Sequence, residues 1–247
     1  MKQTTSKSAA LAICVFVLAS SRLAAAEQDW AFDVSPYLWV ASVGVETSLP
    51  PSTPGGVDRF DTRLSAGAML TAQASYRSVG VFMDVAWVRL NTDALSPGPA
   101  YSAIDLRSDF IHTTAAVTYR LPLDGKLHAE LLAGARVWYV GNDFAVASGA
   151  LAGFNASQDK TWVDPIVGGS VSYDFAERWS AVVKGTIGGF GVSADIAGEV
   201  FAGASYRFND SCSGILGYRY LHEQYDTGTF SFNLDAQGFL LGVGFHF

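Results

Sequence analysis

The feature that most constrains this chain is a hydrophobic pattern of period two without any long apolar run. After the first 26 residues, no stretch has the roughly 18 consecutive apolar residues of a membrane-spanning helix. Apolar side chains instead alternate with polar residues or glycine, as in β-strands with one apolar face. Charged residues make up 16% of the chain, against about 25% in ordinary soluble domains. The pattern indicates either a soluble all-β domain or a membrane β-barrel, in which alternation disperses the apolar residues.

The N-terminal segment, residues 1–26, has the three parts of an export signal. Two lysines give it positive charge, residues 9–19 are apolar, and a run of three alanines ends at Ala26. The apolar part is too short to span a membrane as a helix. We therefore expect cleavage after Ala26, export through the inner membrane, and one mature domain of residues 27–247.

Charge and cysteine content exclude several classes of function. Without the signal, the chain has 13 basic and 23 acidic residues, a net charge of −10. Nucleic-acid binding usually needs a basic surface, so we expect no nucleic-acid partner. Cys212 is the single cysteine after the signal, which excludes a disulfide framework and a multi-cysteine metal site. We expect no cofactor and no bound metal.

Turn-forming residues divide the mature chain in an alternating way. Short breaks fall at 77–78, 121–125, 176–177 and 209–211. Longer polar or Gly/Pro-rich segments fall between them, at 45–63, 91–103, 142–157, 191–198 and 226–234. Outer-membrane barrels have this asymmetry, with short periplasmic turns and longer outer loops.

The segments between these breaks number ten and are the expected strands. An even number places both termini on one side of the membrane, as in single-chain bacterial barrels. The fold class is therefore an all-β, transmembrane, antiparallel up-and-down β-barrel of about ten strands, with eight or twelve as alternatives. The strands are expected near 30–44, 64–76, 79–90, 104–120, 126–141, 158–175, 178–190, 199–208, 212–225 and 235–247.

Alternation also assigns each residue to a face. In the last segment, Phe239 to Phe247 places apolar or aromatic side chains at every odd position, and the even positions are Leu240, Gly242, Gly244 and His246. The face opposite the apolar one is too polar or too rich in glycine to form the core of a sandwich, so the apolar face must meet lipid. Aromatic residues of that face gather beside the short turns, where membrane interfaces favour them. This expected girdle contains Trp30, Tyr76, Tyr119, Tyr173, Trp179, Tyr206, Phe208 and Phe245.

The opposite face is expected to line the lumen, and it carries charges of both signs. A barrel of about ten strands has a lumen only slightly wider than side chains can fill. Buried charges must then pair with one another. They form either a plug of ion pairs or the lining of a narrow pore for small polar solutes. The expected lumen-lining residues are Asp33, Tyr37, Trp39, Asp84, Glu130, Arg136, Trp138, Asp164, Lys184, Glu199, Arg207 and Arg219.

Four stretches resemble outer-membrane proteins of proteobacteria. The C-terminal GFLLGVGFHF resembles their insertion signature, a terminal Phe preceded by apolar residues at every second position. The segments SPYLWVASVG, WVDPIVGGSVSYDFAERWSAVVKGTIGGFG and YRFNDSCSGILGYRY are similar to a porin-like group of small outer-membrane β-barrels. The resemblance covers the mature chain and implies location and fold. It also implies recognition of Phe247 by the barrel-assembly machinery, but it carries no activity.

Sequence alone leaves two main functions open. The first is an integral outer-membrane barrel, porin-like at most, in contact with lipid and lipopolysaccharide. The second is a structural or surface-interaction barrel that acts through its outer loops. We expect no enzyme, because the nearest cluster for an omptin-like protease, His222, Glu223 and Asp226, has its histidine on the lipid-facing parity. His112 is expected in the lumen but isolated. The oligomeric state stays open.

Overall fold

The computed structural model describes residues 29–47, 59–63, 67–95, 101–228 and 230–247. The described part is built from strands, and none of its segments is a helix long and apolar enough to cross a membrane. The predicted signal lies outside the described residues. The strands are β1 (Trp30–Thr47), β2 (Arg59–Arg63), β3 (Gly67–Tyr76), β4 (Val79–Leu95), β5 (Tyr101–Arg120), β6 (Leu127–Ser148), β7 (Phe154–Ala176), β8 (Trp179–Gly188), β9 (Ile196–Asn209), β10 (Cys212–Asp226) and β11 (Ser231–His246).

The strands form one antiparallel sheet that closes on itself. From β3 to β11, neighbours in sequence are neighbours in the sheet, and β11 pairs with β1 to complete the ring. The first half of β1 pairs with β3 and its second half with β2, so β2 and β3 together fill one strand position. The described strands therefore occupy ten positions, and the predicted ten-stranded antiparallel barrel is confirmed.

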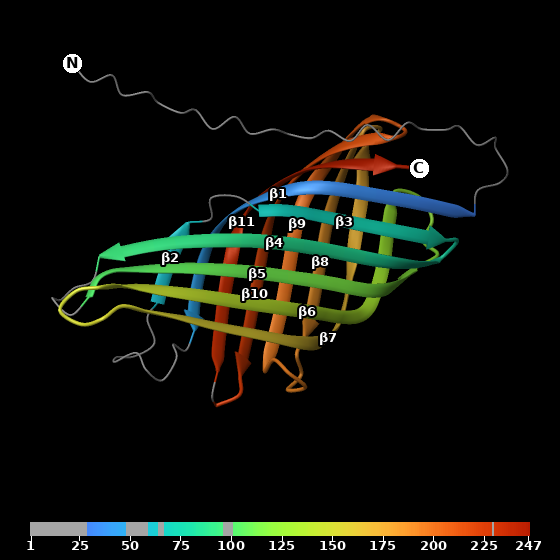
Figure 1. Ribbon diagram of the computed structural model, residues 1–247. Coiled ribbons are helices and arrows are strands. Elements are labelled where there is room, and N and C mark those ends of the chain that lie inside the picture. The colour runs from blue at the N-terminus through green and yellow to red at the C-terminus, as the bar shows by residue number, and fades with distance from the viewer. Residues whose placement is uncertain (1–28, 48–58, 64–66, 96–100, 229) are drawn as a thin grey trace, which may run out of the picture.

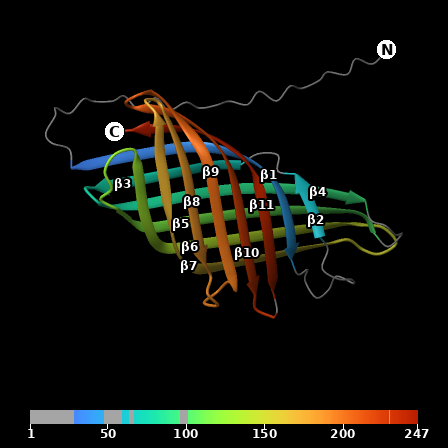
Figure 2. The ribbon, with the colours of Figure 1, turned by 180° about the vertical axis from the view of Figure 1, so that it is seen from behind.

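The barrel has two distinct ends, which we name after their connections. At the turn end lie the turns at 77–78, 121–126, 177–178 and 210–211, together with the C-terminus. Here the backbone of Phe247 pairs with that of Phe32 across the closing seam, with N–O distances of 2.9 and 3.1 Å. The other end of the barrel is the loop end. There β4 to β7 run past the other strands, and β8 to β11 form the opposite wall of the barrel (Figures 1 and 2).

We call the part of β4 to β7 that runs past the other strands the extension. Its strands are longer than the sequence predicted. Segments 91–103 and 142–157 were expected as loops, but β4 and β5 continue to Leu95 and from Tyr101, and only residues 149–153 separate β6 from β7. Strand β2 likewise lies inside the expected loop 45–63. Outward positions of the extension carry polar residues such as Asp109, Asp143 and Asp159 instead of a continuous apolar row. The pattern by which strands were recognised is therefore absent there.

Exposure alternates along each strand inside the barrel. On β11 the odd positions from Phe239 to Phe245 are exposed, and the even positions from Phe232 to Gly244 are buried. The exposed row is apolar, as expected for the face that meets lipid. Near the turn end the exposed aromatic rings pack side by side, with Trp30 5.0 Å from Tyr76 and Trp179 4.8 Å from Tyr206 between ring centroids.

Candidate functional site

The interior of the barrel contains a layer of buried charges, which we call the charged layer: Tyr37, Asp84, Arg136, Glu199 and Arg219. Arg219 is at its centre and is 2% exposed. Its Nη2 lies 2.9 Å from Asp84 Oδ2 and 3.0 Å from Glu199 Oε1. Its Nη1 donates to the Tyr37 hydroxyl at 2.6 Å, and that hydroxyl donates to Asp84 Oδ1 at 2.7 Å. One guanidinium thus joins β1, β4 and β9 to β10.

A second arginine completes the layer from the opposite wall. Arg136 on β6 is 1% exposed and pairs through Nη2 with Glu199 Oε2. Its Nε donates to Thr114 Oγ1 at 3.0 Å. Each carboxylate oxygen of Asp84 and Glu199 therefore forms an ion pair with an arginine or accepts a hydrogen bond from Tyr37. Ions buried in this way are tolerated because each has a partner of opposite charge or a hydrogen bond.

His112 is not isolated, contrary to expectation. Its Nε2 lies 3.2 Å from Arg219 Nη2 and 4.0 Å from Asp84 Oδ2. The sequence placed His112 on the correct face, but Asp84 and Arg219 come from strands distant in sequence. The register around the whole barrel brings them together.

An aromatic layer lies directly on the loop side of the charged layer. It consists of Trp39, Trp138, Trp162, Tyr225 and Phe232, all at most 6% exposed. The rings of Trp138 and Trp162 stack at 5.9 Å, and those of Trp162 and Tyr225 at 4.5 Å. Phe232 packs against Trp162 at 5.4 Å from the opposite wall. A cavity of about 40 Å³ lies beside Trp39 and Trp138, and most of its other lining residues are aliphatic. We call the two layers together the septum.

Two buried carboxylates, Asp164 and Glu223, lie on the loop side of the septum. From the sequence, Glu223 was expected at the outer rim and not in the lumen. Asp164 accepts a hydrogen bond from the backbone N of Ala194 at 2.7 Å and so holds the β8–β9 loop against the barrel. Glu223 accepts one from Trp162 Nε1 at 3.1 Å. Both residues are 0% exposed. Glu223 was grouped with His222 at the outer rim, although its parity, shared with Arg219 and Leu221, already indicated the lumen.

His222 lies on the other face of β10, as its parity predicted. Its Nδ1 is 3.0 Å from Asp235 Oδ1, which also accepts from the Tyr220 hydroxyl at 2.7 Å. These side chains point away from Glu223, so the suspected omptin-like cluster does not converge on one point. Within the described residues, no group of three His, Cys, Asp or Glu side chains is arranged to hold a metal ion.

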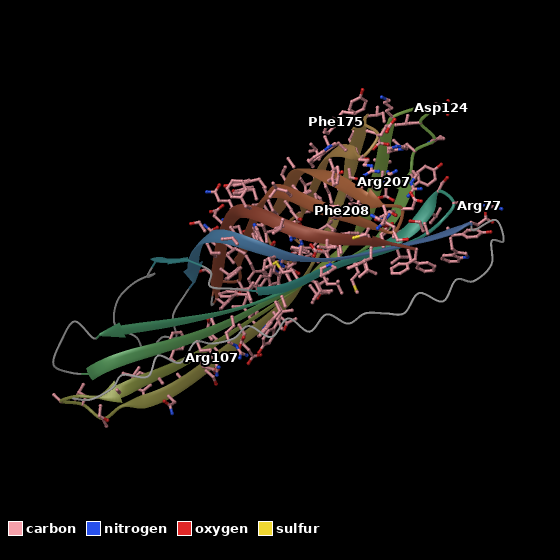
Figure 3. The ribbon with its side chains drawn as sticks, turned by 90° about the horizontal axis from the view of Figure 1, so that it is seen from above. Arg77, Arg107, Asp124, Phe175, Arg207 and Phe208 are labelled. Carbon is pink, nitrogen blue, oxygen red and sulfur yellow. The ribbon has the colours of Figure 1, made fainter. Side chains whose placement is uncertain are left out.

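The other expected lumen residues lie nearer the turn end. Asp33 Oδ1 pairs with His246 Nδ1 at 2.6 Å, and Glu130 accepts from Gln73 Nε2 at 2.8 Å. Lys184 is partly buried and places its Nζ 3.3 Å from the centre of the Phe82 ring. Arg207 is exposed at the turn end, away from the septum (Figure 3). It therefore does not line the lumen at the level of the charged layer.

The outward face of the barrel wall also carries an ion pair. On the outward face of the extension, Arg89 Nε donates to Asp109 Oδ1 at 2.7 Å. The hydrogen bond from Arg89 lowers the pKa of Asp109 below its ordinary range, against the smaller opposing effect of burial. Arg107, Asp143 and Asp159 are exposed on the same face, and Figure 3 shows Arg107 far from the residues of the turn end.

Comparison with known proteins identifies the architecture but no family. No protein-family model matches the sequence, and no curated protein matches it. Among solved structures, the outer-membrane protease OmpT of Escherichia coli aligns with a TM-score of 0.57 and 9% identity, over 88% of this chain and 97% of OmpT. At that identity the likeness shows the fold alone.

Smaller barrels also align. Ail of Yersinia pestis, solved with the heparin analogue sucrose octasulfate, has a TM-score of 0.42 and 15% identity, over 87% of this chain and 99% of Ail. Neisserial surface protein A has a TM-score of 0.37 and 16% identity, over 87% and 97% of the two chains. The predicted outer-membrane barrel fold is confirmed, whereas membership of a porin-like group stays a prediction.

Proposed function

We propose that this chain is an integral outer-membrane barrel that does not conduct solutes and acts through its extension at the cell surface. The closed antiparallel barrel and its outward apolar face support the outer-membrane location. The turn end then faces the periplasm, and the loop end faces the outside. The observation that carries the proposal is the septum, because a pore needs a continuous polar path.

The septum is a poor pore for two separate reasons. In the charged layer, Arg219 and Arg136 bind both carboxylates, so a passing ion would have to break ion pairs that have little access to water. In the aromatic layer, Trp138 stacks on Trp162, and Phe232 packs against both rings, so large apolar side chains stand across the lumen. A narrow selective pore is therefore less well supported than a plug.

The extension supplies the surface that a plugged barrel would use. Its four strands carry an exposed row of charges, including Arg89, Arg107 and Asp159, on the face that continues from the lipid-facing one. On β7, residues 155–162 pair with β6, but pairing with β8 starts only at Ile166. Among the described residues this stretch has no strand on its second side. A free strand edge of this length can bind another chain by adding a strand.

We also propose that the protein is not an enzyme. The His222–Asp235 pair is on the outer wall, where Tyr220 and a histidine suit the headgroup level of the membrane. The buried carboxylates Asp164 and Glu223 are separated from that pair by the barrel wall. Neither set offers an acid, a base and a nucleophile directed at one point.

Planar-bilayer recording of the folded, full-length protein tests the proposal. We expect no steady channel above the membrane baseline, while a general porin in the same bilayer conducts. A steady, ohmic channel that scales with the number of inserted barrels would contradict the plug and favour the porin reading. Assembly of each preparation is checked by heat-modifiable migration on a gel.

A further inference from the structure

A cavity of about 170 Å³ lies on the turn-end side of the charged layer. The polar part of its wall contains Ser35, Thr71 and Lys184, together with Tyr37, Asp84, Glu199 and Arg219 of the charged layer. The other part is apolar, with aromatic and aliphatic side chains of β4, β9, β10 and β11. The apolar group consists of Phe82, Phe201, Ile215 and Leu240. The cavity is therefore amphipathic, and the septum closes it on one side.

Among the described residues, Lys184 is the charged group of this wall that makes no salt bridge, although Asp84 and Glu199 line the same cavity. The oxygens of Asp84 and Glu199 are already bound by Arg219, Arg136 and Tyr37. Among the described residues, no carboxylate lies within 4.0 Å of Lys184 Nζ, whose recorded contact is the Phe82 ring at 3.3 Å. Cations seldom stay inside a protein without an opposite charge. The ammonium group thus provides a place for an anion inside the cavity.

We propose that this cavity is a periplasm-facing binding site for a small monocarboxylate with a compact apolar body. The carboxylate pairs with Lys184, and the apolar body packs against Phe201, Ile215 and Leu240. The volume suits such a molecule, since a buried cavity of about 150 Å³ accommodates benzene. A dianion such as phosphate is disfavoured, because one free cation faces it and the carboxylates of the charged layer are close by. The site is independent of the extension and of the proposed surface role.

Binding of benzoate to the folded protein in detergent, measured by isothermal titration calorimetry, tests the site. Benzyl alcohol has nearly the same shape without the charge, so it serves as the ligand control. We expect wild-type protein to bind benzoate at least tenfold more tightly than benzyl alcohol. We expect Lys184→Met to weaken benzoate binding at least tenfold and Lys184→Arg to retain most of it. Lys126→Met, at an exposed turn, is the matched control and should bind as wild type does.

A second variant separates binding from folding. Ile215→Phe keeps every charge but fills the apolar part of the cavity, so it should also weaken benzoate binding at least tenfold. Both variants are first checked for heat-modifiable migration. If Lys184→Met does not assemble, Ile215→Phe decides the question. Benzoate binding that is absent in the wild type, or unchanged in an assembled Lys184→Met or Ile215→Phe variant, overturns the proposal. Conductance, measured separately, tests the plug and not this site.

Discussion

Arg219 illustrates what single residues decide in this barrel. Neighbours on a strand point to opposite faces, so Tyr218 and Tyr220 are exposed outside while Arg219 is buried inside. Removing one partner from its network would leave a buried ion unpaired, which typically costs about 3–5 kcal/mol. The inward face of Arg219 could be read from the alternation in the sequence. The choice of partners could not, because Asp84 and Glu199 meet Arg219 only when the ring closes.

The Arg89–Asp109 pair on the extension gives a prediction at this scale. The pKa of Asp109, measured from the pH dependence of its carboxyl 13C shift, should lie below the ordinary aspartate pKa of about 3.9, because Arg89 stabilises the charged form. The pair therefore stabilises the extension at a pH above the ordinary aspartate pKa. This stabilisation is lost as the pH falls through the lowered pKa of Asp109. Arg89→Gln should move the titration back up, and Arg107→Gln should move it far less. Equal shifts in the two variants would contradict a specific pair.

Individual strands show where prediction from sequence succeeds and where it stops. The membrane part of β7, from Val163 to Tyr173, has an apolar residue or glycine at each outward position, because lipid requires it. Its outer part, from Phe154 to Thr161, has Asn155, Ser157 and Asp159 there and was divided between a loop and a strand. Water on the outside removes the alternation but not the hydrogen bonds to β6. Boundaries set by contact with lipid were predictable, and those set by backbone pairing alone were not.

The difference between the membrane part and the outer part of β7 can be tested by introducing arginine at one position in each part. Val167 and Asp159 share the outward face, but only Val167 lies in the apolar row. Val167→Arg should impair assembly, because arginine on the lipid face near mid-membrane costs about 2–4 kcal/mol. Asp159→Arg should assemble normally, and Val167→Leu controls for the change of side chain. The folded fraction is read from heat-modifiable migration. Normal assembly of Val167→Arg would show that this face does not meet hydrocarbon.

The whole molecule combines a closed wall with a filled interior. Pairing of β11 with β1 leaves no open sheet edge in the membrane part of the barrel. An open edge there would be unfavourable, because lipid cannot form hydrogen bonds with its backbone groups. Ten strands enclose a lumen that side chains can nearly fill, and large residues occupy it from several strands at once. The sequence predicted a charged lumen. It did not predict the aromatic layer as a unit, because Trp39, Trp138 and Trp162 become neighbours only across the interior.

The two layers of the septum are in series along the barrel axis, so each should block the lumen without the other. Serine at all four ions of the charged layer removes both signs together, so none of these four ions is left without its partner. We expect almost no conductance in this variant, which contains Asp84→Ser, Arg136→Ser, Glu199→Ser and Arg219→Ser. Serine at three rings of the aromatic layer should also remain closed, in Trp138→Ser, Trp162→Ser and Phe232→Ser.

Only the variant that combines both sets should conduct in planar bilayers, because only there does a continuous path exist for water and ions. Heat-modifiable migration must first show that all three variants assemble. Steady channels in the charged-layer variant alone would mean that the aromatic rings are no barrier. Silence in an assembled combined variant would mean that the lumen is closed by residues outside the septum.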